Sequence, residues 1–233
     1  MAQGEYQKDA AEGSKPEGRK PSQENYLKLL AKSIVVGLVI GLAIGFGIFF
    51  LSSMMIVKKP AIYLYPETPS QVSVQVLVNG KITASEPEYG KGWNVLASPD
   101  GKIDGKYDYL FYEAELRNPA LPSGGWVVEH AKIGEWFDTM LPRLGLNERE
   151  AGQFKEYWLK ELPPARYYEM RLLSGEYLRD NLALQISPTP DTVIRAEFYF
   201  RPLEEKKALA EPVIVTPKRR GFVVVEWGGI LAD

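Results

Sequence analysis

The sequence predicts an α+β protein: a mostly antiparallel β domain with an inserted helix pair, preceded by one transmembrane helix. In residues 58–130 and 167–229, apolar side chains alternate at every second position in repeated runs, whereas in 133–162 they recur every three or four positions. Period two is typical of strands and period 3.6 of helices. Strand runs on either side of a helical stretch favour antiparallel sheets. The third observation is the run 33–57, which carries no ionisable side chain.

The uncharged run divides the chain into three parts. Residues 1–22 are polar and rich in Gly, Ser and Pro, a composition that predicts a disordered tail. Residues 23–57 are expected to form one helix that includes the membrane anchor at 33–57, because about 20 apolar residues span a bilayer core. Residues 58–233 form the α+β domain.

Basic residues predict the orientation of the anchor, because they favour the cytoplasmic side of a membrane. More of them precede the run than follow it: Lys15, Arg19, Lys20, Lys28 and Lys32 before, Lys58 and Lys59 after. The tail is therefore expected in the cytoplasm and the domain outside it. A cleaved signal peptide has a shorter apolar region nearer the N-terminus. A buried helix of a soluble domain is the other alternative.

Glycines recur at every fourth position of the run, at Gly37, Gly41 and Gly45. Such a ridge of small residues lets a second helix approach closely. Besides membrane lipid, it predicts a homodimer or a membrane-protein partner. The alternative is a helix that only faces lipid, since glycine is common in membrane helices.

The first strands of the domain are expected at 58–65 and 71–78. Asn79-Gly80 follows at once, and it is the strongest short hairpin signal, so 71–78 and 81–86 are expected to pair. The remaining strands are expected at 93–98, 107–116, 126–130, 167–173, 182–187, 192–200, 212–216 and 221–229.

A helix pair is predicted between these strands. Its first helix carries apolar residues on one face: Ile133, Trp136, Phe137, Met140, Leu141 and Leu144. The second is expected to begin at Asn147 with Glu150 three positions later, the pattern of a capping box. Pro163-Pro164 ends it, because proline removes a backbone donor and clashes with the preceding turn.

Composition excludes several classes of site. The chain has no cysteine and one histidine, His130, which excludes disulfides, iron–sulfur clusters and Cys- or His-rich metal sites. No metal and no cofactor are expected. With 28 Lys+Arg against 30 Asp+Glu, the chain lacks the basic excess of a nucleic-acid-binding domain.

Glu226 is the first candidate for a functional carboxylate, because it lies in the otherwise apolar strand 221–229. Burial raises the pKa of a carboxyl group, and raised values suit general acids. The alternative is a structural ion pair with Arg195, which alternates with apolar residues in 192–200. Glu113 is the second candidate. If both faced one cleft at about 5–9 Å, they could hydrolyse a glycoside.

Aromatic residues near these carboxylates are candidates for ligand binding. Tyr109 and Tyr112 belong to the aromatic strand 107–116, and Trp93 and Trp227 lie in strands of their own. Aromatic side chains stack on sugars or peptides, but they also pack across strands in ordinary cores. With Arg195, these four form the predicted binding set.

Several segments together resemble a bacterial family of anchored or secreted proteins without an assigned activity. They are 59–67 (KPAIYLYPE), 87–95 (PEYGKGWNV), 145–158 (GLNERE…FKEYW), 190–199 (PDTVIRAEFY) and 221–229 (GFVVVEWGG). The resemblance spans nearly all of 58–233 and implies that the tail and anchor are a variable addition to a portable domain. It implies no activity.

These observations favour a single-pass anchored protein of the cell envelope whose outer domain binds or scaffolds. One alternative is an envelope hydrolase of glycan or peptide that uses Glu226 and Glu113. Another is a structural subunit of a membrane assembly, with the anchor as its interface. An enzyme would bring both carboxylates into an open cleft, whereas a binding module would bury them or expose an aromatic patch.

Overall fold

The computed structural model describes residues 23–51, 54–117 and 120–232. The chain divides into two compact units, Met1–Ser52 and Ser53–Asp233. In the first unit, α1 spans Gln23–Leu51. The tail predicted at 1–22 lies outside the described residues.

The boundary between the helix and the domain lies earlier in the chain than the predicted one at 57/58. Helix α1 ends at Leu51 and β1 begins at Met54, so 54–57 are strand rather than helix. Val57 is fully buried, and it pairs with Ala114 and Ile230 on either side. Strand pairing on both sides and the burial of Val57 outweigh the uncharged run that predicted a helix through residue 57. Among the described residues, no helix has both the length and the hydropathy needed to cross a membrane.

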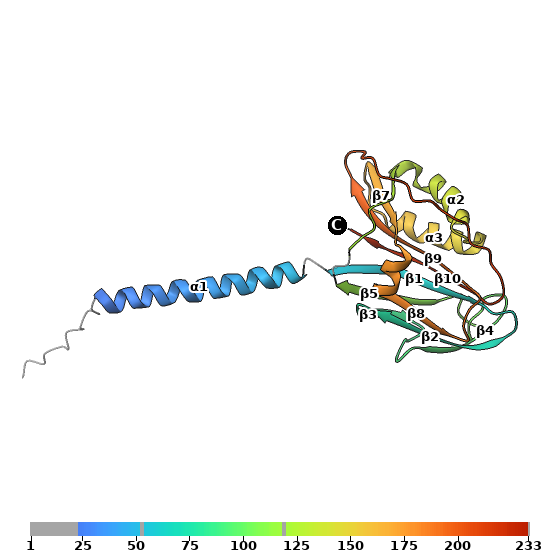
Figure 1. The fold of residues 1–233 in the computed structure, drawn as a ribbon, viewed down its shortest axis with the longest axis horizontal. Coiled ribbons are helices and arrows are strands. Elements are labelled where there is room, and N and C mark those ends of the chain that lie inside the picture. Colours follow the sequence, from blue (N-terminus) through green and yellow to red (C-terminus); the bar gives the residue numbers. More distant parts are fainter. Residues whose placement is uncertain (1–22, 52–53, 118–119, 233) are drawn as a thin grey trace, which may run out of the picture. The chain divides into compact units, whose positions relative to one another are not determined.

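The second unit contains ten strands and three further α-helices within its described residues (Figure 1). The strands are β1 Met54–Tyr65, β2 Ser70–Val78, β3 Gly80–Glu86, β4 Trp93–Ala97, β5 Leu110–Arg117, β6 Trp126–Glu129, β7 Tyr167–Leu172, β8 Leu182–Ser187, β9 Thr192–Leu203 and β10 Val223–Leu231. The helices are η1 His130–Lys132, a 3₁₀ turn, α2 Ile133–Arg143, α3 Glu148–Glu161 and α4 Gly175–Asn181.

These strands form two sheets. The larger has seven strands in the order β3-β5-β1-β10-β9-β7-β6, and the smaller has three in the order β4-β2-β8. All named pairs are antiparallel except β9 with β10. The predicted α+β class, with mostly antiparallel sheets, is confirmed, and α2 and α3 lie where the helix pair was expected.

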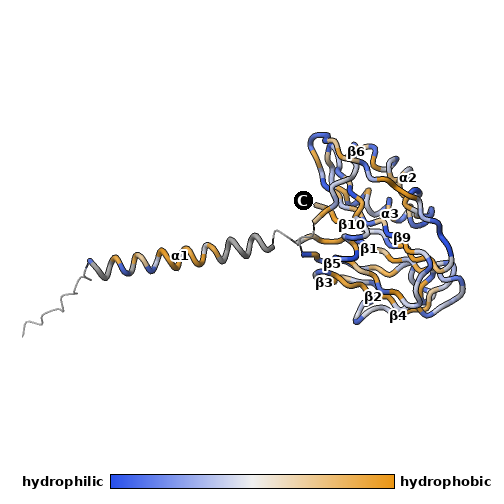
Figure 2. Tube along the Cα trace, viewed as in Figure 1, coloured by the Kyte–Doolittle hydropathy of each residue, from blue (hydrophilic) through white to orange (hydrophobic). Residues whose placement is uncertain are grey.

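The two faces of the seven-stranded sheet are covered differently (Figure 1). On one face, α2 and α3 pack over alternate residues of β9 and β10. On the other face, the three-stranded sheet and α4 cover the intervening residues. Figure 2 shows hydrophobic residues along the strands and hydrophilic ones in most loops. The seven-stranded sheet is therefore the middle layer of the domain.

The hairpin expected at Asn79-Gly80 is wrong. β2 belongs to the three-stranded sheet and pairs with β4 and β8, whereas β3 pairs with β5 in the other sheet. Gly80 has φ +156°, and a Cβ there would lie 1.8 Å from the carbonyl oxygen of Glu115. The dipeptide therefore marks a crossing between sheets, and glycine is needed for close backbone approach rather than for a two-residue turn.

The strand expected at 212–216 is absent from the described ladders, and α4 was not anticipated. Residues 212–216 alternate between half-buried and exposed side chains but pair with no strand of the described chain. α4 is short, and its N-cap Ser174 accepts a hydrogen bond from the Tyr177 amide at 3.1 Å. Seven residues carry too little periodicity to be recognised in the sequence.

Candidate functional site

The domain buries several glutamates, and their hydrogen-bond partners show which of them belong to a candidate site. Four glutamate side chains are fully buried among the described residues: Glu150, Glu169, Glu197 and Glu226. Burying an ionised carboxylate costs free energy unless it is paired and hydrogen-bonded. The partners of each carboxylate therefore distinguish structural groups from candidates for function.

Glu150 is held by the start of its own helix and by one arginine. It forms the predicted capping box with Asn147 at the N-terminus of α3. Arg219 contacts both of its carboxylate oxygens, with Nη1 at 2.9 Å from Oε2 and Nη2 at 2.9 Å from Oε1. Such a two-pronged pair fixes geometry as well as charge. Glu150 joins α3 to the segment before β10, a structural role.

Glu169 on β7 is surrounded by cations. Arg171, Arg201 and Lys207 all contact its carboxylate, and Arg201 does so with Nη2 at 2.5 Å. Burial raises the pKa of Glu169, but the hydrogen bonds from Lys207, Arg201 and Arg171 outweigh it, so the pKa lies below the usual value. This carboxylate is ionised and fully satisfied.

Glu226 pairs with Arg195 in the middle of the sheet. The two residues are neighbours in the parallel β9–β10 register, and Arg195 Nε donates to Glu226 Oε2 at 2.5 Å. Tyr112 donates its hydroxyl to Glu226 Oε1 at 2.9 Å. The ion pair that the sequence offered as an alternative is present.

Tyr112 comes to Glu226 from β5, which is separated from β10 by β1. The intervening strand β1 has an irregular register at this level, against β10 between Lys58 and Ala61 and against β5 between Val57 and Ala61. Burial raises the pKa of the Tyr112 hydroxyl well above its usual value, and the charge of Glu226 adds to this effect. The hydroxyl is therefore a permanent donor to the carboxylate.

Glu197 differs from the other three, because neither of its carboxylate oxygens has a hydrogen-bond partner. It lies two positions after Arg195 on β9 and so on the same face of the sheet. Its register partner is Gly228, where a Cβ would lie 2.8 Å from Glu197 Oε2. The first glycine of the 221–229 motif thus leaves room for the carboxyl group.

Burial, and then the charge of Glu226, raise the pKa of Glu197 well above its usual value, although Arg195 opposes the shift. This direction favours the protonated form of Glu197. Glu226, Glu197, Arg195 and Tyr112 are hereafter called the charge centre. With one carboxylate protonated, the single positive charge of Arg195 balances the single negative charge of Glu226.

A pocket of about 690 Å³ reaches the charge centre through Arg195. Most of its walls are aliphatic, from Leu172, Leu173, Leu178, Val193 and Ile214, and Arg179 of α4 also lines it. The Arg195 side chain keeps 14% of its exposure, whereas Glu226 keeps none. The arginine is thus the accessible end of the buried network.

The predicted pairing of Glu226 with Glu113 is wrong. Tyr112 points to Glu226, and the next residue of a strand points to the opposite face. Glu113 instead lies near Tyr157 of α3, on the helix-covered face. The period-two pattern of 107–116 separates Glu113 from Tyr112 by face, but which of these faces Glu226 shares depends on the sheet order. The two carboxylates share no cleft.

The predicted aromatic binding residues are also dispersed. Trp227 is buried under α3 and donates from Nε1 to the Tyr63 hydroxyl at 3.2 Å. Trp93 is buried between the sheets and donates to the Pro87 carbonyl at 2.8 Å. Tyr109 precedes β5, and its hydroxyl accepts a hydrogen bond from Lys59 Nζ at 2.9 Å. The rings form two pairs, Tyr109 with Trp227 at 6.5 Å and Trp93 with Tyr112 at 6.4 Å between centroids. Of the four aromatic residues, Tyr112 is the one that hydrogen-bonds to the Arg195–Glu226 pair.

The predicted helix-association residues lie in α1, with Gly45 inside the helix as well. Nothing lies within 4 Å of a Cβ built at Gly37 or Gly41. No other described residue therefore contacts α1 at Gly37 or Gly41.

Glu197 and Arg179 were missed from the sequence. A signal for Glu197 existed, since Arg195 and Glu197 alternate with apolar Ile194, Ala196 and Phe198 and so share a face with each other. Two charged side chains on one face of an apolar strand are expected to have partners of opposite charge, because burying an unpaired charge costs free energy. Arg179 carried no such signal, because α4 was not recognised. No protein-family model, curated protein or solved structure matches this chain.

Proposed function

We propose that the domain is a binding module, and that its ligand is an anion with a short aliphatic body held in the pocket above Arg195. The observation that carries the proposal is the accessible arginine of the charge centre, which lines an otherwise aliphatic cavity of about 690 Å³.

The charge centre favours binding because it holds Arg195 in place. The guanidinium has five N–H donors, and Glu226 accepts one hydrogen bond from it, at Nε. Its Nη2 is buried, lies 2.5 Å from the same carboxylate oxygen and forms no hydrogen bond, so a ligand would meet the part of the side chain that is exposed. An arginine oriented from behind by a buried carboxylate keeps donors for a ligand and loses little rotamer entropy on binding.

The charge of the pocket favours an anion. The Arg195–Glu226 pair is neutral, the protonated form of Glu197 is favoured, and Arg179 adds a positive charge at the wall. Aliphatic side chains supply the apolar contact that small-molecule sites use for most of their affinity. A carboxylate on an aliphatic body fits both features, whether it comes from a fatty acid or from the C-terminus of a peptide that ends in leucine.

Titration calorimetry on the full-length chain in detergent tests this proposal. The probes are octanoate, acetyl-Leu-Leu with a free carboxylate, and octanol as the uncharged control. We expect octanoate or acetyl-Leu-Leu to bind, octanol to bind at least tenfold more weakly, and the better of the two anions to identify the source of the carboxylate.

Two arginine variants and one matched control locate the site. Arg179→Gln and Arg195→Gln should each weaken anion binding about tenfold, as expected for the loss of a charged hydrogen bond. Arg143→Gln removes an exposed arginine far along the chain, on α2, and should change nothing. Equal binding by all three variants, or equal binding of octanol and octanoate, contradicts the proposal.

The N-terminal part supports a location for this module. Residues 33–51 of α1 carry no charge, and at 1.5 Å per residue they extend nearly the roughly 30 Å of a bilayer core. Large apolar residues from Ile34 to Leu42 are about half exposed or more, and the described part of α1 is coloured hydrophobic over much of its length in Figure 2. A helix that is apolar all round is typical of a membrane span.

We therefore place the domain outside the cytoplasm on a single-pass anchor, as expected for the anchored or secreted family that its segments resemble. The chain has no cysteine, so single cysteines report topology cleanly. An impermeant maleimide on intact cells should label Glu204→Cys in the domain and not Ser14→Cys in the tail. Extraction of the chain from membranes by alkaline carbonate, or the reverse labelling, contradicts the anchor or its orientation, respectively.

The glycine ridge of the anchor supports a partner within the membrane, either a second copy or another membrane protein. Gly41→Leu fills the open surface at the centre of the ridge and should reduce cross-linking between anchors at least severalfold. Leu42→Ile, at an adjacent exposed position, is the matched control.

A further inference from the structure

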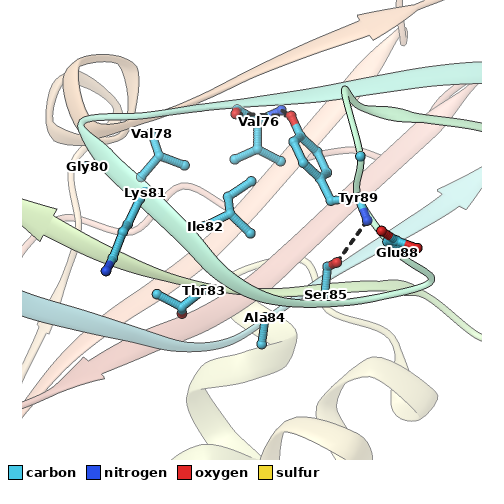
Figure 3. A pocket seen from close by; sticks show the side chains of 11 residues that line it. Val76, Val78, Gly80, Lys81, Ile82, Thr83, Ala84, Ser85, Glu88 and Tyr89 are labelled. Carbon is cyan, nitrogen blue, oxygen red and sulfur yellow. Dashed lines mark hydrogen bonds between the residues drawn. The ribbon is translucent and has the colours of Figure 1, made fainter.

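A second feature of the domain is an open wedge between its two sheets (Figure 3), and its lining shares no residue with the Arg195 pocket. The chain leaves the three-stranded sheet at the end of β2 and enters the seven-stranded sheet as β3. The two strands diverge from Gly80, and between them lies a cavity of about 540 Å³ with Val76, Val78 and Ile82 facing its interior. β3 is the edge strand of its sheet.

Backbone groups of β2 also reach this wedge unpaired. The β2–β4 register ends at Val74. Beyond it, the Tyr89 hydroxyl accepts a hydrogen bond from the Val76 amide at 2.8 Å and donates to the Val76 carbonyl at 3.2 Å. One phenol thus makes both hydrogen bonds that a neighbouring strand would make. Val78, two residues on, directs its backbone groups to the same side, where the described chain offers no partner.

The chain also carries a segment that suits such a wedge, although Pro212, Val213 and Ile214 of this segment line the Arg195 pocket of their own domain. From Glu211 to Lys218, no backbone N–H or C=O group forms a hydrogen bond within the described chain. From Glu211 to Val215, exposed and half-buried side chains alternate, with Val213 91% and Val215 83% exposed. Alternation with period two is that of an extended strand, and an exposed apolar strand with free edges is a site for pairing with another chain.

We propose that this extended segment of one copy docks in the wedge of a second copy by strand addition. The charges at the two ends are complementary. Lys81 lies near the closed end of the wedge and Glu88 at its open end (Figure 3), while Glu211 and Lys218 flank the segment. Placing Glu211 by Lys81 and Lys218 by Glu88 runs the segment antiparallel to β2 and parallel to β3.

The docked segment would complete both edges. Its backbone would pair with Val78 on one side and with the outer edge of β3 on the other, and its valines would cover the half-buried Val78 and Ile82. Main-chain hydrogen bonds supply affinity in this mode of recognition, and pockets for alternate side chains supply specificity. Lys81 contacts Glu115 at 3.1 Å but is 66% exposed, so it can also meet Glu211.

Disulfide trapping between full-length copies in detergent tests the proposal. One copy carries Ile82→Cys, which faces the interior of the wedge (Figure 3), and the other carries Val215→Cys in the segment. We expect mild oxidation to trap this pair at least fivefold more than a control pair of Val215→Cys with Lys160→Cys, an exposed position on α3. Association through the anchors alone would bring all pairs together and show no such preference.

Charge exchange and a peptide make the test specific. Lys81→Glu in the wedge copy should cut trapping at least threefold, and Glu211→Lys in the segment copy should restore it. An acetylated peptide of residues 210–218 should compete, whereas the same peptide with both valines changed to serine should not. Absence of selective trapping overturns the proposal. If the peptide binds but copies are not trapped, the occupant is an extended segment of another protein, and the second-copy assignment is overturned.

Discussion

The two faces of the seven-stranded sheet come from the same strands and have different chemistry. On the helix-covered face, β9 and β10 present the uncharged Phe198, Phe200 and Trp227, which pack against α2 and α3, and the buried charge on these helices is Glu150, paired with Arg219 at the start of α3. On the opposite face, the intervening residues include Arg195, Glu197 and Glu226, which lie together among apolar neighbours such as Val224. A face that is built for stability alone needs no buried charges, since apolar residues of equal volume stabilise as well or better. Glu150 and Glu169 are buried charges with full sets of partners, so it is the unpartnered Glu197 and the pocket at Arg195 that favour the proposed ligand site on this face.

The comparison is tested most strongly by breaking the ion pair from one side. Arg195→Met leaves Glu226 in the sheet without its cation and should lower the free energy of unfolding by about 3–5 kcal/mol. The double variant Arg195→Met with Glu226→Met removes both charges and should regain most of that loss. Urea denaturation of both variants measures the difference. Equal losses in the single and double variants would mean that packing, not charge, holds this face.

The next largest effect on the free energy of unfolding is expected from filling the space beside Glu197 on the charged face. Gly228→Ala places a Cβ at 2.8 Å from both Glu197 Oε2 and the Pro60 Cα, closer than real Cβ contacts allow. We expect a loss of about 1–3 kcal/mol from overpacking, measured by urea denaturation. Gly152→Ala on α3, where nothing lies within 4 Å, is the control and should be neutral or stabilising.

The pH dependence of stability should single out Glu197. Its pKa is raised in the folded state, so between the unfolded value of about 4.3 and the folded value the native state binds more protons. Stability is then complete below the unfolded pKa and falls as pH rises, by at most about 1.4 kcal/mol per pH unit. Glu197→Gln should remove this fall, so the variant gains on the wild type from pH 5 to pH 8.

Glu169 provides the opposite sign for comparison. Its pKa is lowered in the folded state by Lys207, Arg201 and Arg171. Its contribution is present above the unfolded pKa and is lost as pH falls through the folded value. Glu169→Gln should therefore flatten the acid side of the stability profile and leave the alkaline side unchanged. Identical profiles for the Glu169 and Glu197 variants would contradict the assignment of their protonation states.

The smallest effect is expected on the helix-covered face. Phe198→Leu exchanges one apolar side chain for another within the aromatic cluster and should cost about 1–1.5 kcal/mol, as near-isosteric core exchanges do. It should leave the pH profile and anion binding unchanged. A loss of octanoate binding in this folded variant would show that the two faces are not independent.

Much of the fold followed from the sequence. Period two in 192–200 and 221–229, the switch to period 3.6 at Ile133 and the capping box at Asn147 predicted the class and its helix pair. Sheet order did not follow, because pairing is set by contacts between distant residues. Asn79-Gly80 therefore predicted a hairpin where the chain crosses between sheets, and the run 212–216 predicted a strand where no partner is described.

The site followed only in part, for the same reason. Glu226 and Arg195 were recognisable as charges within apolar strands, and their pairing needed only that β9 and β10 be neighbours. Glu113 was misplaced, because a strand shows which residues share a face but not what covers that face. The space for Glu197 depends on its register with Gly228, and the pocket above Arg195 depends on α4. No local sequence pattern shows either feature.

The most direct test of the central claim, that the charge centre serves ligand binding, combines stability and affinity in one variant. Titration of octanoate and acetyl-Leu-Leu into the full-length Arg195→Met/Glu226→Met protein, beside the wild type, measures it. The account predicts a folded protein whose stability lies within about 1–2 kcal/mol of the wild type, with anion binding at least tenfold weaker. A double variant that binds both probes as well as the wild type, or a wild type that binds neither, would contradict it.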